Sequence, residues 1–513
     1  MSKEPGRNST NISWLHTLLC RISVMASIFF LLSSATHCEL NASYLVSNPN
    51  AQLNVFQEDF DFFYQTLLDS HPGFDARQPA FYQEGVTLMK ELAAVTDTLQ
   101  FETKLRAFTH LLQDGHTKVA SYSGQSPTTY PIGLWWHESG WYVDIISKEH
   151  KDLIGSKVIS INGMDAETFM NRLMQLATGE NIYLFRDQVS FYLRNPASLL
   201  ALNLASSDGA LHLTLERSGT QMEIVLIEAD RHSLWGNIKT GITAQHNENY
   251  WGQALPDDSV YYLQFNAMSE TEGTPDNPFA GWISFLNDAF STIDSLGIEN
   301  LVIDLRNNGG GHSTMGDILL SFCSLPDSIR YFGASMKISE LVLDFYQMDL
   351  NTMNEALSSD LGYEVIETDL PFTVHYNIGS SPLIKPRTLE ELAPNAALST
   401  PPRKFDGRLI LIIGSQTYSS AADLAVLCHD NGLATLYGSP TGGKPSSYGE
   451  SVGFRLPNTA ISCTVSVKYF QRPDIHRDPS DSLYPNVYIP VSPDEYFSSI
   501  DTLWERLLQE IKS

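Results

Sequence analysis

Residues 407–444 read GRLILIIGSQTYSSAADLAVLCHDNGLATLYGSPTGGK. The apolar run 409–413 predicts a buried strand, and residues 421–429 predict a helix that ends at Asn431-Gly432, since glycine often closes a helix. A second strand is expected at 434–437. The stretch therefore predicts a βαβ unit, in which a helix connects two parallel strands, and with it an α/β fold.

Two adjacent serines, Ser419 and Ser420, lie where this helix begins. The start of a helix has free N–H groups and a positive dipole end, so a serine there can act as a nucleophile and the Ala421 N–H can stabilise an oxyanion. The alternative is structural, because Ser420-Ala-Ala-Asp423 is a variant of the capping box. Lys444, beyond a glycine-rich turn, is either a partner of the serine or a solvated lysine.

A second stretch, residues 300–312, reads NLVIDLRNNGGGH. Residues 301–305 predict a buried parallel strand that runs into a glycine turn. Consecutive glycines let backbone N–H groups approach a ligand closely, which makes Gly309 and Gly310 candidates for an oxyanion hole. Asp304 and Arg306 are expected to brace this turn.

Taken together in this order, the segments 304–311, 417–423 and 438–444 resemble peptidase family S41, the tail-specific or C-terminal-processing proteases. The resemblance implies an S41-type layered α/β core, with Ser420 as nucleophile and Lys444 as the lysine of a Ser-Lys dyad. Two positions depart from the family pattern. Asp423 stands where a glutamate is usual, and Tyr448 stands where a glutamine usually orients the lysine.

A third segment gives a second candidate for the base. Residues 111–117, LLQDGHT, resemble a stretch of the S41 branch related to tricorn protease, in which a histidine is the general base. His116 is therefore an alternative to Lys444. A histidine with an ordinary pKa of about 6.5 needs little tuning at neutral pH, whereas a lysine at about 10.4 must be desolvated. The structural alternative for His116 is a histidine in a turn.

The first 37 residues predict a signal peptide, because basic residues precede a short apolar run at 22–32 and small residues follow it. Cleavage is expected near Ala35, which predicts a secreted or periplasmic protein. A lipid anchor on Cys38 and an uncleaved signal anchor are the alternatives. No later segment is expected to cross a membrane. Asn41-Ala-Ser43 is a glycosylation sequon, meaningful only in a eukaryote.

The charge balance excludes several classes of function. The chain has 513 residues with 32 Lys and Arg against 59 Asp and Glu, a net charge of −27. Without residues 1–37, which hold three basic residues and one acidic residue, the balance is 29 against 58, or −29. Nucleic-acid binding is not expected, because no basic run is present. No metal motif appears, the spacing of the five cysteines gives no metal pair or disulfide scaffold, and no cofactor is expected.

The remaining patterns divide the chain. Helical spacing of aromatic residues predicts a helical region at 38–128. Short strands and an Asn162-Gly163 turn predict a β-domain at 129–232, which resembles a PDZ-like domain, with a purely structural β-domain as the alternative. The S41-type core is expected at 233–513, with an insertion at about 331–405 that forms a lid or extends the sheet.

These features predict an exported serine-type endopeptidase that acts on protein or peptide substrates through an acyl-enzyme on Ser420. Two non-catalytic alternatives stay open. The repeats of interphotoreceptor retinoid-binding protein resemble S41 cores yet bind lipophilic ligands, and a PDZ-like domain can serve as a peptide-binding adaptor. The sequence does not predict the oligomeric state, the pairing of any disulfides or the physiological substrate.

Overall fold

The structure is a computed structural model that describes residues 53–119, 128–230, 238–240, 246–396, 402–498 and 500–512. The predicted signal peptide, Cys38 and the sequon at 41–43 lie outside these ranges and stay predictions. In the described part of the chain, no helix combines the length and the apolar character needed to span a membrane.

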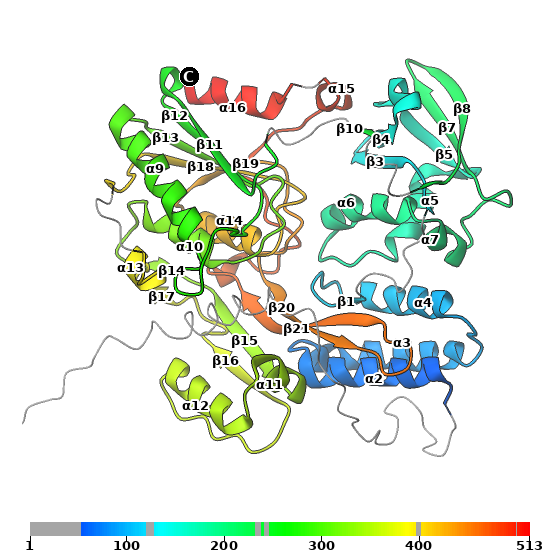
Figure 1. The fold of residues 1–513 in the computed structure, drawn as a ribbon, viewed down its shortest axis with the longest axis horizontal. Coiled ribbons are helices and arrows are strands. Elements are labelled where there is room, and N and C mark those ends of the chain that lie inside the picture. The colour runs from blue at the N-terminus through cyan, green and yellow to red at the C-terminus, as the bar shows by residue number, and fades with distance from the viewer. Residues whose placement is uncertain are drawn as a thin grey trace, which may run out of the picture.

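A six-stranded sheet forms the centre of the largest unit, in the upper left of Figure 1. Its strands stand in the order β11 (Tyr250–Leu255), β12 (Val260–Phe265), β13 (Asn300–Asp304), β18 (Arg408–Ile413), β19 (Thr435–Gly438) and β22 (Val487–Tyr488). All neighbours are parallel except the antiparallel pair β11 and β12. The predicted α/β class and the βαβ unit are confirmed.

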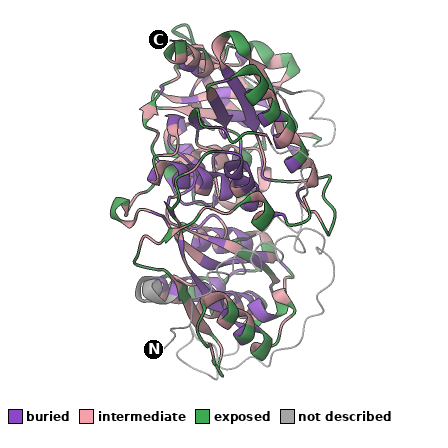
Figure 2. Cartoon of the chain, turned by 90° about the vertical axis from the view of Figure 1, so that its left-hand side faces the viewer, coloured by how far each residue is buried: buried purple, intermediate pink, exposed green. Residues whose placement is uncertain are grey.

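Helices cover both faces of this sheet, because successive side chains of a buried strand point to opposite sides. Leu301, Ile303 and Leu411 share one core with α9 (Ala280–Leu296), α10 (Thr314–Ser321) and α14 (Ser420–Asp430). Val302 and Ile410 share another core with α16 (Thr502–Lys512). Figure 2 shows the buried strands between these helices. The layered arrangement holds the carboxyl ends of β13 and β18 side by side.

A second sheet lies below, where Figure 1 shows the blue N-terminal helices against orange C-terminal strands. Strands β1 (Lys118–Val119), β15 (Gly333–Ile338), β16 (Phe372–Tyr376), β20 (Ser447–Arg455) and β21 (Ser462–Gln471) form it. Its core includes side chains of α2 (Val55–Ser70), α3 (Phe74–Leu92), α4 (Thr98–His110), α11 (Glu340–Tyr346) and α12 (Leu350–Leu361). Because β15 and β16 lie within 331–405, this segment extends a sheet.

The third unit contains a seven-stranded sheet and three helices, on the right of Figure 1. It comprises β3 (Ile132–His137), β4 (Gly140–Ser147), β5 (Lys157–Ile161), β6 (Met164–Asp165), β7 (Leu211–Arg217), β8 (Thr220–Leu226) and β10 (Ile238–Thr240), with α5 (Ala166–Met174), α6 (Ile182–Leu193) and α7 (Pro196–Ala201). The predicted strands are present, and the helix that the sequence also predicts at 167–176 is α5. The resemblance to a PDZ-like domain stays a prediction, as do the domain boundaries.

Some local predictions differ from the structure. The segment 483–489 also predicts a strand, but only the two residues of β22 form one, since Leu483 and Pro485 precede it in a loop. Helices α6 and α7 lie in the segment 182–201, in which no helix was predicted. Cys323, Cys428 and Cys463 are buried free thiols, so none of these three forms a disulfide.

The bracing of the glycine turn is confirmed and extended. The guanidinium of Arg306 donates hydrogen bonds to both oxygens of Asp304 at 2.6–3.1 Å. It also donates to Asp501 at the start of α16, at 2.5 and 3.0 Å. Tyr262 donates to Asp304 from the neighbouring strand at 2.7 Å. These bonds tie the end of β13 to the C-terminal helix.

Candidate active site

Strand β18 and helix α14 are joined by a sharp turn that carries Ser419. This residue is the N-cap of α14, with φ 53° and ψ −133°, and its side chain makes no capping hydrogen bond. A residue other than glycine at positive φ costs about 1–2 kcal/mol. Helix α14 begins at Ser420, so the cap predicted at Ser420 is one residue away from the observed cap. The turn presents the Ser419 hydroxyl instead of using it to cap the helix.

The two serines face different partners. The Ser419 Oγ lies 3.1 Å from Nε2 of His116. The Ser420 hydroxyl donates instead to the carbonyl oxygen of Gly311 at 2.6 Å, and Ser420 is only 8% exposed. Thus the structure brings His116 to Ser419 and leaves Ser420 on the opposite side of the turn.

His116 is held in place by contacts from three directions. Its backbone N–H donates to Asp114 Oδ1 at 2.9 Å, and its carbonyl accepts from the Thr464 hydroxyl on β21 at 2.7 Å. Asp114 Oδ2 lies 3.3 Å from Nε2 of the buried His71. Since His71 Nδ1 accepts from the Gly73 N–H, Nε2 carries the proton and donates to Asp114. The loop that carries His116 is therefore anchored to both α2 and β21.

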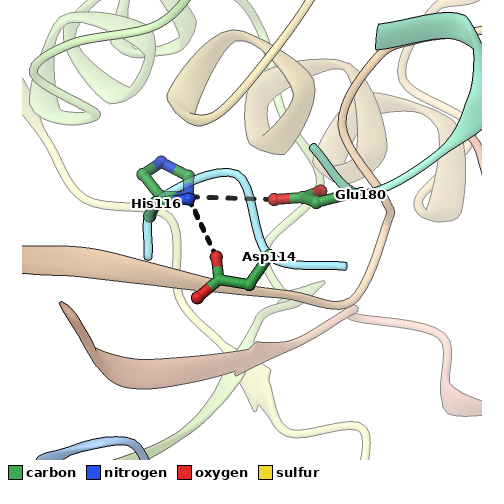
Figure 3. A group of neighbouring side chains, drawn as sticks. All are labelled: Asp114, His116 and Glu180. Carbon is green, nitrogen blue, oxygen red and sulfur yellow. Dashed lines mark hydrogen bonds and ion pairs between the residues drawn. The ribbon is translucent and has the colours of Figure 1, made fainter. Parts of the chain in front are cut away.

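A phenol and a carboxylate stand behind the imidazole. The Tyr418 hydroxyl lies 2.9 Å from Nδ1 of His116 and donates to Glu180 Oε1 at 3.2 Å. The rings of Tyr418 and His116 are stacked with centroids 5.0 Å apart. Figure 3 shows Glu180 and Asp114 converging on the same imidazole nitrogen, Nδ1. These donor and acceptor atoms fix the orientation of the ring.

Burial sets the ionisation of these groups. It lowers the pKa of His116, although the Asp114 carboxylate acts in the opposite direction. It raises the pKa of Glu180 to about 8, partly offset by the backbone N–H of Lys444. For Asp114, burial raises the pKa but the His71 hydrogen bond and the histidine charges outweigh it, so the pKa falls below its usual range. At neutral pH the imidazole is consequently neutral and able to accept a proton.

The glycine turn after β13 lies directly against the serine turn. A Cβ atom built on Gly310, whose φ is +98°, would stand 2.7 Å from Cβ of Ser419 and 3.0 Å from the backbone N of Ser420. Only glycine allows this approach. The Tyr418 N–H also donates to the Asn308 carbonyl at 3.1 Å, which joins the two turns.

The predicted oxyanion donors have different surroundings. The Gly310 N–H donates to the Asn308 side chain at 2.9 Å, and the Ala421 N–H donates to the Tyr418 carbonyl at 3.2 Å. The N–H groups of Gly309 and Ser420 have no acceptor among the residues that the structure describes. The predicted oxyanion donor was the N–H of the residue after the nucleophile. If Ser419 is the nucleophile, that donor is the Ser420 N–H and not the Ala421 N–H.

Lys444 reaches the site through its backbone. Its N–H donates to Glu180 Oε2 at 2.6 Å. Tyr448, at the position where the family usually has a glutamine, instead packs its ring on His71 with centroids 4.5 Å apart. Its hydroxyl occupies the space above Gly73, where an added Cβ would meet it at 2.0 Å. Tyr448 therefore supports the histidine side of the site.

Residues 259–477 match the model of peptidase family S41. This part of the chain is similar to an S41 peptidase domain. It contains the β13 turn, Ser419 and Lys444, and the resemblance seen in the sequence is confirmed. The family supports a peptide hydrolase, and a peptidase implies peptide or protein substrates.

Solved structures give the same fold around the S41 domain. The S499A mutant of CPAF is 16% identical, with 90% of this chain and 98% of that chain covered and a TM-score of 0.63. Mature CPAF complexed with lactacystin is 16% identical, with 89% and 97% covered and a TM-score of 0.61. No curated protein matches the chain by sequence. At this identity the likeness to CPAF shows the fold alone.

Two residues of the site were not predicted from the sequence, Glu180 and Tyr418. Glu180 precedes α6 in the β-domain, and nothing in the surrounding Thr178-Gly-Glu-Asn181 marks it as functional. Tyr418 adjoins the serine pair, which is the only signal it offers. Together with His116 and Asp114, Glu180 also forms a group whose potential metal-ligating atoms all lie within 4.8 Å of one another.

Proposed function

We propose that the protein is a serine-type endopeptidase in which Ser419 is the nucleophile and His116 is the general base. The contact of 3.1 Å between Ser419 Oγ and His116 Nε2 carries this proposal. Ser420, the nucleophile expected from the family spacing, donates its proton to the Gly311 carbonyl and is buried. A buried hydroxyl bonded to a carbonyl cannot approach a substrate without breaking that bond.

The proton path follows from the tautomer. To accept the proton of Ser419, Nε2 of His116 must be unprotonated, so Nδ1 carries the hydrogen. Nδ1–H then donates to the Tyr418 hydroxyl, which in turn donates to Glu180 Oε1. Glu180, whose pKa burial raises to about 8, accepts this bond through Oε1 also when Oε2 carries a proton, and its ionised form stabilises the imidazolium that forms. Tyr418 and Glu180 thus act as positioning residues for His116.

The reaction proceeds in two halves. Ser419 Oγ attacks the peptide carbonyl while its proton moves to His116 Nε2, and the oxyanion is stabilised by the N–H groups of Ser420 and Gly309. The imidazolium then gives its proton to the leaving amine, and an acyl-enzyme remains. Water attacks this ester with His116 again accepting a proton, which releases the carboxylic acid and restores Ser419.

The lysine keeps a smaller role in this proposal. Lys444 contacts the site through the N–H that it donates to Glu180 Oε2. That bond holds the carboxylate in position for Tyr418. A lysine base would also require a pKa several units below about 10.4, whereas the neutral imidazole is already present. His116 is accordingly the preferred base.

Binding of lipophilic ligands is the less favoured function. An apolar pocket lies among β15, β16, β21 and α12, lined by residues that include Met336, Leu357 and Phe470. Its volume is about 60 Å³. Small-molecule sites in proteins usually measure about 300–1,000 Å³. This pocket is therefore too small to favour a binding protein for a long apolar ligand.

Export by the predicted signal peptide also belongs to the proposal. The apolar run at 22–32 and the small residues that follow it support a secreted or periplasmic enzyme. N-terminal sequencing of the protein recovered from its native compartment tests this. A start near residue 36 supports export, and an intact leader on a protein retained inside the cell contradicts it.

Covalent labelling tests the choice of nucleophile directly. A fluorophosphonate reacts with an activated serine hydroxyl, and fragmentation of the labelled peptide by mass spectrometry distinguishes Ser419 from Ser420. We expect the label on Ser419, together with cleavage of an unstructured protein such as casein. Label on Ser420, or no label and no cleavage by the folded chain, would contradict the proposal.

A further inference from the structure

Four side chains from distant parts of the sequence, His116 among them, meet around Nδ1 of its imidazole. Asp114 and His116 lie on the loop before β1, Glu180 precedes α6, and Tyr418 precedes α14. Figure 3 shows Asp114 Oδ1 and Glu180 Oε1 on two sides of His116 Nδ1. The distances from Nδ1 are 3.9 Å to Asp114 Oδ1 and 3.7 Å to Glu180 Oε1. These atoms point toward a common centre.

The spacing is close to that of a metal site. With bonds of 2.0–2.1 Å, the donor atoms of a tetrahedral zinc ion stand about 3.3 Å apart. The three donor atoms of Asp114, His116 and Glu180 lie within 4.8 Å of one another. The Tyr418 hydroxyl, at 2.9 Å from Nδ1 and 3.2 Å from Glu180 Oε1, occupies a fourth corner. The distances of 3.7 and 3.9 Å from Nδ1 are longer than this spacing, so both carboxylates and the imidazole must close in on the ion to complete the coordination.

The charges at this place also favour a cation. Side chains of Asp114 and Glu180 are 0% and 2% exposed. Within the described residues, their ion pairs involve only histidines, His71 and His116, and no lysine or arginine. Both carboxyls accept hydrogen bonds, Asp114 from His71 and the His116 N–H, and Glu180 from Tyr418 and the Lys444 N–H, but none of these donors carries a permanent positive charge. A divalent ion would neutralise both carboxylates at once.

We propose that Asp114, His116 and Glu180 form an inhibitory binding site for a divalent transition-metal ion of the zinc type. Carboxylate oxygens and an imidazole nitrogen are ligands that zinc accepts. The ion reaches the site from the side of His116, whose side chain is 17% exposed. The inhibitory effect rests on the proposed catalytic role of His116, whereas binding itself does not.

Inhibition follows from proton balance on the imidazole. In the active tautomer the single ring proton is on Nδ1 and the lone pair is on Nε2. A metal ion that binds Nδ1 takes the lone pair of that nitrogen, and the ring proton moves through solvent to Nε2. Any proton on Glu180 is released to solvent. Nε2–H then donates to Ser419 Oγ and can no longer accept its proton, so acylation stops.

Metal binding is tested first without any activity. The full-length Ser419→Ala variant keeps every ligand and cannot digest itself. After treatment with EDTA it is titrated with ZnCl₂ in a calorimeter, and its Tm is recorded with and without the metal. We expect one zinc ion per chain and a higher Tm in its presence. Absence of a saturable single site would overturn the proposal.

Variants locate the ion. In the Ser419→Ala background, Glu180→Gln is expected to weaken zinc binding at least about tenfold, and His116→Ala is expected to abolish the rise in Tm. The control is Asp208→Asn, because Asp208 pairs with His212 at 2.9 Å on the surface of the β-domain. This control is expected to bind zinc like its parent. If the Glu180 and His116 variants bind zinc as tightly as their Ser419→Ala parent, the assignment of ligands is wrong.

Inhibition is then measured on the active enzyme. Cleavage of casein by the EDTA-treated wild type is expected to fall as ZnCl₂ occupies the calorimetric site and to recover on adding EDTA. An active enzyme that binds zinc at this site without losing activity would overturn the inhibitory role. A chain that binds zinc and cleaves nothing would contradict the proposed function and leave the metal site supported.

Discussion

The hydroxyl of Ser419 and Nε2 of His116 lie 3.1 Å apart although 303 positions separate the two residues in the sequence. The serine comes from the strand β18 side of the S41 domain, and the histidine comes from the N-terminal region. Two unrelated sets of contacts hold them, the glycine turn against Ser419 and the Asp114 carboxylate under His116. The predictions on activity below depend on this pair.

The two serines are expected to respond very differently to substitution. Ser419→Ala removes the nucleophile and should lower kcat for casein cleavage by about 10³-fold or more. Ser420→Ala removes only the hydrogen bond to Gly311, worth about 1 kcal/mol, and should change kcat less than about tenfold. The assay compares initial rates of the folded variants. The reverse ranking would show that the family spacing identified the nucleophile correctly.

The choice between the two bases gives a second comparison. His116→Ala is expected to abolish cleavage, because no other neutral base contacts Ser419 among the described residues. Lys444→Ala keeps its backbone N–H, and therefore the bond to Glu180, so we expect it to retain at least about one tenth of the activity. If the Lys444→Ala variant is inactive and the His116→Ala variant still cleaves casein, the base is Lys444 and the site is a Ser-Lys dyad.

The phenol of Tyr418 is expected to position the base. Tyr418→Phe keeps the ring stacked on His116 but removes the hydroxyl between Nδ1 and Glu180. We expect kcat to fall about tenfold to hundredfold with KM little changed, because the ring loses its preferred tautomer. A merely structural role would lower Tm without this separation of kcat from KM. Phe454→Leu, on β20 against the core of the second sheet, serves as a control for packing defects.

The pH at which kcat/KM rises distinguishes a histidine base from a lysine base. Burial lowers the pKa of His116 below its usual 6.5. A general base works unprotonated, so activity should rise with pH through a value below 6.5 and be on its plateau at pH 7. Asp114 opposes this shift, hence Asp114→Asn should move the rise to still lower pH. An activity that rises only above about pH 8 would indicate a lysine base.

Asp423 is expected to reduce stability at neutral pH. Burial raises its pKa from 3.8 to about 7, so between these values the folded state binds a proton that the unfolded state has lost. Below pH 3.8 the carboxyl is protonated in both states and does not lower the free energy of unfolding. That free energy then falls as the pH rises from 3.8 to about 7. Asp423→Asn should therefore stabilise the protein at pH 8 by about 1–3 kcal/mol and have little effect at pH 4.

Thermal unfolding in the Ser419→Ala background measures this effect without self-digestion. The matched control is Asp276→Asn, because Asp276 is exposed on the surface. Its Tm should follow that of the parent across the pH range. If Asp423→Asn and the control behave alike at pH 8, the carboxyl of Asp423 is solvated and the expectation is wrong.

The sequence by itself determined the α/β sheet, the glycine turn and the serine turn. Apolar runs such as 409–413 and the run of glycines at 309–311 are local patterns, and local patterns predict strands, helices and turns. The sequence also offered His116 and Lys444 as bases. It did not separate Ser419 from Ser420, because the start of a helix is uncertain by a residue or more and the positive φ of Ser419 arises from packing against Gly310.

Only the tertiary structure decided which groups meet. His116, Glu180 and Tyr418 come from segments more than 60 residues apart, and no spacing rule connects them. Their contacts arise because β1 pairs with β21 and because the β-domain places Glu180 beside the serine turn. The shifts in pKa follow from the same burial. Long-range packing, which a linear pattern does not record, thus sets the partner of Ser419 and the charge around it.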